Sequence, residues 1–296
     1  TPGFYGVRLS DNRVSVELTT TQRVAFQRYR FDQQNGAQVL TDFQHGLKFI
    51  HDDRVLQSEI AINAANTEIS GTVHTQGWVT RQYSFVLRFD QPFSALRLPV
   101  RAGEKAPRYV LNFKPGAGRT LEARIAFSTV DVAGARRNLA VVDGKNFAQV
   151  QAEAEAQWQN LLARARIEAP VRQKRIFYTA LYHAFIHPSD IADVDGRVRG
   201  PDGKVLQAPG GVYYSTLSLW DTFRGVQPLF TLLVPERVDG MINTLLAHHA
   251  AQGYLPLWTA WGQETHTMIG NPALPVIANA VASGFTGFDR KQALQA

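Results

Sequence analysis

The sequence predicts a multidomain β + α chain, in which an antiparallel β-sandwich is followed by a helical linker and an incomplete (α/α)6 toroid. Turn signals recur about every ten residues in 1–140, which is the spacing of a sandwich. Near Asp131 the apolar period changes from about two residues to about 3.6 residues. Past Pro170 helical stretches follow one another in pairs. We therefore set the domains at 1–145 (β-sandwich domain), 146–169 (helical linker) and 170–296 (first part of the barrel).

The first domain shows the alternation expected of strands that are buried on one face. Val14, Val16 and Leu18 place apolar groups on the same side of one strand. Asn35-Gly36 suits a tight hairpin turn, because both residues tolerate positive φ. Further strands are expected at 6–9 and 24–31, and near 55–63, 67–76, 78–90, 94–100, 108–113 and 120–130. Because such sandwiches serve many functions, the fold alone does not indicate one. We expect residues before about 145 to be almost wholly β.

After about residue 146 we expect almost wholly helical structure. Residues 146–166 are rich in Ala, Gln and Glu, which lose little entropy in a helix. Pro235 suits a first helical turn, and Gly253 and Gly284 suit C-terminal caps. The expected barrel helices are 171–187, 217–233, 235–251, 265–284 and a last one from 287. Two of them, 217–233 and 265–284, are apolar on most sides, so we expect more polypeptide to pack against them.

Composition excludes several classes of function. No run of 18 apolar residues exists, so no membrane span is expected. The net charge is +6, but the basic residues are scattered rather than clustered, which argues against a nucleic-acid surface. Cysteine is absent, so disulfides are excluded and the redox compartment stays open.

The stretch 213–270 carries the candidate chemistry. Its aromatic and polar residues are Trp220, Asp221, Arg224, Trp258, Trp261, Gln263, Glu264 and His266. Aromatic faces beside carboxylates and amides suit sugar rings, which have apolar faces and hydroxyl edges. The alternative is a pair of buried helices whose Trp residues are core. Asp221 itself is also the kind of carboxylate that satisfies free N–H groups at a helix start.

No metal ligand is assigned within the chain. His183 and His187 have the spacing of a helical metal site, but no HExxH pattern surrounds them. The loop from Asp190 to Asp202 is rich in oxygen ligands, yet its spacing fits no EF-hand, and Asx turns explain it better. We assign His248-His249 to a polar helix face.

Several motifs in a fixed order carry a family resemblance. They are Ser218-Leu219-Trp220-Asp221-Thr222-Phe223-Arg224, Pro228-Leu229, Pro235-Glu236-Arg237, Gly253-Tyr254-Leu255-Pro256-Leu257-Trp258, Glu264-Thr265 and Met268-Ile269-Gly270. In this order they resemble glycoside hydrolase family 92, the calcium-dependent exo-acting α-mannosidases. The resemblance covers nearly all of the chain and is most specific in 171–296.

The resemblance implies roles for five residues. Asp221 is expected to accept hydrogen bonds from hydroxyls of a terminal mannose, in a cleft shared with Trp258 or Glu264. Trp220 and Trp258 are expected at the same substrate-binding site. Arg224 is expected to support it by pairing with Asp221 or Glu264. Glu264 is expected to touch the substrate or to support residues that do, because in the family the general acid and base come later in the chain.

The resulting hypothesis is an exo-α-mannosidase that releases mannose with inversion from α-1,2 linkages of glycans such as N-glycans. The Ca²⁺ ligands are expected mostly outside this chain, as are the acid and base, so the chain alone should be inactive. The rest of the barrel would be a continuation or a second chain, and the location periplasmic or secreted. Gln263 and Asn271-Pro272 depart from the family pattern, which leaves the linkage open. The alternatives are a non-catalytic carbohydrate-binding module and a structural part of a larger assembly.

Overall fold

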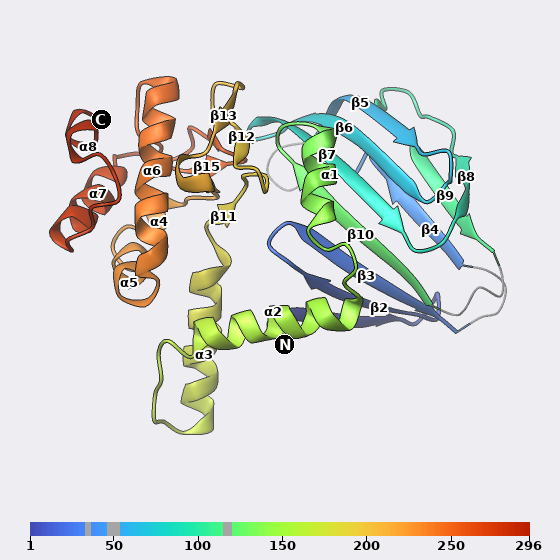
Figure 1. The fold of residues 1–296 in the computed structure, drawn as a ribbon, viewed down its shortest axis with the longest axis horizontal. Helices are drawn as coiled ribbons and strands as arrows, with labels where there is room; N and C mark the ends of the chain where they lie inside the picture. Colours follow the sequence, from blue (N-terminus) through green and yellow to red (C-terminus); the bar gives the residue numbers. More distant parts are fainter. Residues whose placement is uncertain (33–36, 46–53, 115–119) are drawn as a thin grey trace. The chain divides into compact units, whose positions relative to one another are not determined.

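The structure is a computed structural model of the 296-residue chain that describes residues 1–32, 37–45, 54–114 and 120–296 (Figure 1). The turn expected at Asn35-Gly36 lies outside these residues. The chain folds into two compact units, Thr1–Gln159 and Asn160–Ala296, which we call the β unit and the helical unit. In the described part of the chain, no helix combines the length and the apolar character needed to cross a membrane.

The β unit is built on two antiparallel sheets, as the alternation predicts. The larger sheet has seven strands in the order β1-β2-β3-β10-β7-β6-β5, and the smaller has three in the order β4-β9-β8. The strands are β1 Phe4–Leu9, β2 Val14–Thr20, β3 Val24–Phe31, β4 Ala37–Asp42, β5 Arg54–Ile62, β6 Glu68–Gln76, β7 Thr80–Phe89, β8 Phe93–Arg97, β9 Arg108–Phe113 and β10 Thr120–Ser128. Only β4 has no counterpart in the predicted strands.

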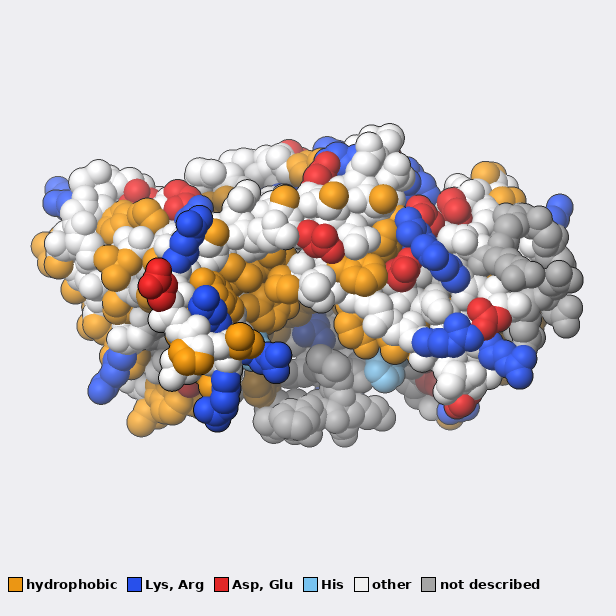
Figure 2. Space-filling view, turned by 90° about the horizontal axis from the view of Figure 1, so that it is seen from below, with side chains coloured by type: hydrophobic (Ala, Val, Ile, Leu, Met, Phe, Trp, Pro, Cys, Tyr) orange, Lys and Arg blue, Asp and Glu red, His pale blue; other side chains and the backbone are white. Residues whose placement is uncertain are grey.

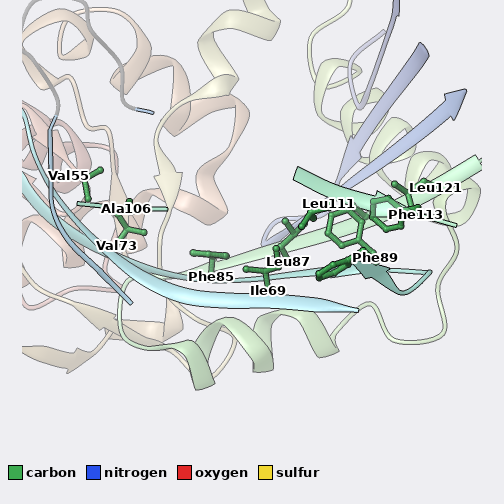
Figure 3. Close-up of a cluster of buried hydrophobic side chains, with 12 residues drawn as sticks. Val55, Ile69, Val73, Phe85, Leu87, Phe89, Ala106, Leu111, Phe113 and Leu121 are labelled. Carbon is green, nitrogen blue, oxygen red and sulfur yellow. The ribbon is translucent and has the colours of Figure 1, made fainter. Parts of the chain in front are cut away.

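The main core of the β unit lies between these two sheets (Figure 3). Ile69 and Phe89 of the larger sheet meet Leu111 and Phe113 of the smaller one, and all four are buried. The Phe89 and Phe113 rings lie 5.1 Å apart between centroids. Fully burying a side chain of this size stabilises the fold by about 1.5–3 kcal/mol. The alternating apolar positions therefore hold the two sheets together.

Two helices, α1 (Val132–Ala140) and α2 (Phe147–Leu162), cover the other face of the larger sheet. The expectation of almost wholly β structure before residue 145 is wrong at α1. Asp131 caps its first turn by accepting a hydrogen bond from Gly134 N at 2.5 Å, and Ala135 and Leu139 bury one side of the helix. On α2, Phe147 is fully buried, and the Arg28 guanidinium lies 4.0 Å from the centre of its ring.

The helical unit contains most of the expected helices with changed limits. They are α3 Val171–Ile186, α4 Leu219–Thr222, α5 Val226–Leu233, α6 Pro235–Gln252, α7 Ala273–Ala282 and α8 Arg290–Gln295. Pro235 begins α6, and Gly253 ends it at φ +83°, as predicted. The expected helix 217–233 is interrupted between α4 and α5, and the expected helix 265–284 begins only at Ala273, after Pro272.

Short two-stranded sheets replace helix in parts of this unit, which corrects the expectation of almost wholly helical structure after residue 146. β11 (Ser189–Asp190) pairs with β14 (Tyr214–Ser215), β12 (Arg197–Arg199) with β13 (Val205–Gln207), and β15 (Thr259–Ala260) with β16 (Gln263–Glu264). A single 3₁₀ turn, Pro209–Gly211, precedes β14. The aspartates of this loop make the expected Asx turns: Asp190 Oδ1 accepts from Ala192 N at 3.1 Å, and Asp202 Oδ1 accepts from Lys204 N at 3.0 Å.

Candidate functional site

A pocket of about 450 Å³ lies in the helical unit, between α4 and the segment that leads into α7. Its lining residues are Trp220, Asp221, Phe223, Arg224, Ile269, Gly270, Asn271, Pro272 and Pro275. One wall, which we call the α4 wall, consists of Trp220, Asp221, Phe223 and Arg224. It supplies an exposed aromatic ring, a carboxylate and a guanidinium. The other wall, which we call the α7 wall, is largely apolar and consists of Ile269, Gly270, Asn271, Pro272 and Pro275. This combination fits a ligand with one hydroxyl-rich edge and one apolar face.

Asp221 lies in the first turn of α4, as predicted, and its side chain is exposed. The hydroxyl of Ser218 donates a hydrogen bond to Asp221 Oδ2, and Asp221 N donates to Ser218 O at 3.2 Å. The carboxylate is therefore oriented by its own helix start. Because it is exposed in a pocket wall, it can also accept hydrogen bonds from a ligand.

Arg224 lines the same pocket one turn of chain later. Its guanidinium carbon lies 5.0 Å from the centre of the Phe223 ring. In the described part of the chain, Arg224 forms no ion pair with Asp221 or Glu264. Arg224 is exposed where it lines the pocket.

Trp258 does not line the pocket, but backbone pairing brings it beside α4. It forms an isolated antiparallel bridge with Ser218. On either side of this bridge, Leu219 N donates to Leu257 O at 3.1 Å, and Thr259 N donates to Leu217 O at 3.2 Å. The chain segment before α4 and the segment before β15 thus form a short two-stranded connection, and Trp258 is half-buried in it.

Glu264 is buried next to this connection, with 8% of its surface exposed, and it does not line the pocket. Its carboxylate accepts hydrogen bonds from Leu257 N at 2.5 Å, Trp258 N at 3.1 Å, Thr265 N at 2.9 Å and His266 N at 3.0 Å. Of the five residues expected at the site, the pocket brings together Trp220, Asp221 and Arg224. Trp258 and Glu264 are joined to its walls through the backbone.

The opposite wall was not assigned a role from the sequence. Ile269 and Gly270 belong to a recognised motif, and Asn271-Pro272 to a departure from the family pattern, but Pro275 gave no signal. Gly270 has φ +90°, a conformation that favours glycine, where the chain turns into α7. The wall exists because the expected helix 265–284 does not start until Ala273.

The burial of His248 differs from what the sequence predicted. This residue was assigned to a polar helix face, but only 1% of its surface is exposed. Neither ring nitrogen has a hydrogen-bond partner among the described residues. Burial lowers the pKa of His248 to about 4, and the Glu264 carboxylate opposes this shift in part. His248 is therefore neutral at pH 7.

The described residues do not offer a complete site for the calcium that the family resemblance implies. Among them, no group of three or more His, Asp or Glu side chains is arranged to hold a metal ion. In the 190–202 loop, Asp190 and Asp202 each use a carboxylate oxygen to accept a backbone hydrogen bond in an Asx turn. Asp221 is the single carboxylate among the described residues that line the pocket, whereas Ca²⁺ takes six to eight oxygen ligands.

Family comparison places the chain. A sequence model of the glycosyl hydrolase family 92 N-terminal domain matches residues 1–128, and one of the family 92 catalytic domain matches residues 134–296. No match was found among curated protein sequences.

Solved structures give the same result. The family GH92 α-mannosidase BT3965 from Bacteroides thetaiotaomicron is 30% identical, with a TM-score of 0.91 over 99% of this chain and 42% of that one. The inverting mannosidase BT2199 from Bacteroides thetaiotaomicron VPI-5482 is 25% identical, with a TM-score of 0.87 over 100% of this chain and 41% of that one. The chain thus spans less than half the length of these relatives. Matched over both its β and helical units, the chain belongs to glycoside hydrolase family 92.

Proposed function

We propose that this chain is part of an exo-acting α-mannosidase that releases mannose, with inversion, from α-1,2 linkages of mannose-containing glycans such as N-glycans. The observation that carries the proposal is Asp221, an exposed carboxylate oriented by Ser218 in a pocket that also presents Trp220. A solved complex of the similar mannosidase BT3965 with mannoimidazole supports it.

Within this proposal, Asp221 accepts hydrogen bonds from hydroxyls of the terminal mannose, and Trp220 packs against an apolar face of the ring. Arg224 provides donors at the edge of the pocket, while Trp258 and Glu264 contribute from the adjoining connection. Inverting glycosidases need a general acid and a general base far enough apart to admit a water molecule. We place both carboxylates outside this chain, together with most calcium ligands, so this chain alone should release no mannose.

A second part of the proposal concerns what packs against the helical unit. Figure 2 shows hydrophobic side chains gathered on the surface of this unit. Leu232 and Ile269 are 77% and 83% exposed, and Leu274 is also exposed. Such apolar surface is unusual for a face that stays in contact with water. We propose that the remainder of the barrel covers it, as a continuation or as a second chain, and that the complete enzyme is periplasmic or secreted.

The other candidate function is non-catalytic carbohydrate binding. The same pocket favours it, since an exposed Trp beside a carboxylate recognises sugars without any acid or base. The two functions differ in whether the complete protein turns substrate over.

The test is Asp221→Ala in the complete enzyme, assayed with α-1,2-mannobiose. We expect kcat/KM to fall about 100- to 1000-fold, because hydrogen bonds to substrate hydroxyls that strengthen in the transition state are worth several kcal/mol. Asp11→Ala, which removes an exposed carboxylate of the β unit, is the matched control and should leave turnover unchanged. Near wild-type turnover in Asp221→Ala would reduce Asp221 to a helix-start residue. Mannose binding without any hydrolysis by the complete wild type would favour the binding module.

A further inference from the structure

Glu264 is a buried carboxylate whose partners are backbone amides. Its four N–H donors come from Leu257, Trp258, Thr265 and His266. In the described part of the chain, no Lys, Arg or His forms an ion pair with it. The buried charge is therefore balanced by oriented N–H dipoles, as in backbone anion sites.

Two of these amides lead to one wall of the pocket. Leu257 and Trp258 belong to the segment that pairs with Leu217–Leu219 through the Ser218–Trp258 bridge. Leu219 is the first residue of α4, and Trp220 and Asp221 follow it directly. The position of the α4 wall is thus fixed, through one backbone pairing, to amides that Glu264 holds.

The other two amides lead to the opposite wall. Thr265 and His266 lie four and three residues before Ile269, where the lining of the α7 wall begins. His266 has φ +54°, a left-handed conformation that a non-glycine residue adopts only when its surroundings hold it. The Glu264 carboxylate supplies that hold by accepting the His266 N–H group.

We propose that Glu264 is a positioning residue that ties the two walls of the pocket together and so sets the distance between α4 and the 269–272 segment. It acts through the backbone, because both carboxylate oxygens are occupied by amides and the side chain does not line the pocket. The link to mannose recognition rests on the proposed function. The link between Glu264 and the two walls does not.

The first test is hydrogen exchange of the chain carrying Glu264→Gln. The glutamine oxygen can accept from one pair of amides, but its NH2 group then faces the other pair, donor against donor. We expect amides in 254–258 and 265–270 to exchange about tenfold faster or more, because buried donors lose their acceptor. Glu264→Asp keeps the charge but is shorter, so it should give an intermediate result and serves if the glutamine variant folds poorly.

The matched control is Glu68→Gln in the β unit. Glu68 is also buried, but it pairs with Arg88 at 3.2 Å and Arg136 at 2.7 Å. Its replacement should leave exchange in 254–270 at the wild-type rate. Unchanged exchange in 254–270 of Glu264→Gln, or a rise on one side of Glu264 only, would overturn the proposal.

The second test uses the complete enzyme and α-1,2-mannobiose. We expect Glu264→Gln to raise KM by about tenfold or more with a smaller change in kcat, because a loosened pocket binds substrate less well while the acid and base are untouched. A fall in kcat with wild-type exchange rates would mean that Glu264 touches the substrate, which contradicts positioning. If the complete wild type hydrolyses no mannoside, the proposed function fails, and the exchange experiment still decides the role of Glu264.

Discussion

The β unit and the helical unit differ in how far their most exposed large apolar side chains are open to solvent: the exposed fraction reaches 60% in the described part of the β unit and 89% in the helical unit. In the β unit, the large side chains Phe85 and Phe147 are enclosed, one between the sheets and one on α2 against the larger sheet. In the helical unit, Leu232 and Ile269 are mostly exposed. The helical unit also buries polar atoms that have no partner among the described residues, including the Tyr213 hydroxyl and both ring nitrogens of His248.

The two units also treat a buried carboxylate differently. Glu68 of the β unit is neutralised by Arg88 and Arg136, so it joins α1 to the sheet as an ion-pair network. Glu264 of the helical unit holds backbone amides instead. The first arrangement joins a helix to a sheet, whereas the second holds the backbone of two segments that lead to the walls of the pocket. Departures from ordinary packing therefore gather in the unit that carries the candidate site.

The largest effect should come from Phe147→Ala, compared with Leu232→Ala. Phe147 is fully buried and carries the Arg28 guanidinium on its ring, so its loss should lower the free energy of unfolding of the β unit by about 3–5 kcal/mol. Leu232 is 77% exposed on a helix, so its replacement by the equally good helix former Ala should change stability by less than about 0.5 kcal/mol. Urea unfolding of the whole chain measures both.

A cost of several kcal/mol for Leu232→Ala would break the comparison. It would mean that the apolar surface of the helical unit is covered in solution by another copy of the chain. The concentration dependence of unfolding would then reveal that copy.

Much of the fold follows from local pattern. The period-two alternation predicted nearly every strand of the β unit, because one face of each strand is buried. The limits of α6 followed from Pro235 and Gly253, whose backbone preferences act locally. The pattern failed where long-range pairing decides. Three of the six residues of strand β4 are exposed, and residues 217–218 do not continue the expected helix because Ser218 pairs with Trp258.

The candidate site was only partly predictable for the same reason. The motif around Trp220, Asp221 and Arg224 is contiguous in sequence, so its members share one wall. The opposite wall depends on the late start of α7 at Ala273, which apolar periodicity does not reveal. His248 occupies a buried position of α6, whereas the adjacent His249 is only partly buried, and the sequence pattern did not separate the two. Whether the five expected residues bind substrate stays a prediction.

The next effect concerns pH, because His248 is buried in its neutral form. Its pKa is about 4 in the folded chain and about 6.5 in the unfolded one. Because the pKa is lowered in the folded chain, the unfolded chain binds this proton at a higher pH than the folded chain does. The stability that depends on neutral His248 is therefore fully present above pH 6.5 and is lost as the pH falls toward 4. The shift corresponds to about 3 kcal/mol in the helical unit.

Unfolding experiments at pH 7 and pH 4 measure this loss. In His248→Leu the loss should be smaller by about 3 kcal/mol, because the leucine does not titrate. The exposed His183, replaced by Gln, is the control and should keep the wild-type pH dependence. Equal losses in the wild type and in His248→Leu would show that His248 is not buried as described, and the contrast between the units would lose one of its supports.

The smallest effect should come from surface charge, which separates the units far less than burial does. In the β unit, Arg8 pairs with Asp32, but their side chains are 58% and 43% exposed. Water screens such a pair, and holding both side chains in place costs entropy, so a double-mutant cycle with Arg8→Ala and Asp32→Ala should give a coupling of about 0.5 kcal/mol or less. Raising the salt concentration to about 1 M, where the Debye length is about 3 Å, should remove most of it.

The exposed pair of Arg164 and Glu236 gives the matching cycle in the helical unit, and we expect a coupling of the same size. A coupling above about 2 kcal/mol in the β unit alone would mean that ion pairs contribute substantially to the stability of this unit. Similar small values in both would leave enclosed side chains such as Phe147 as the source of the difference.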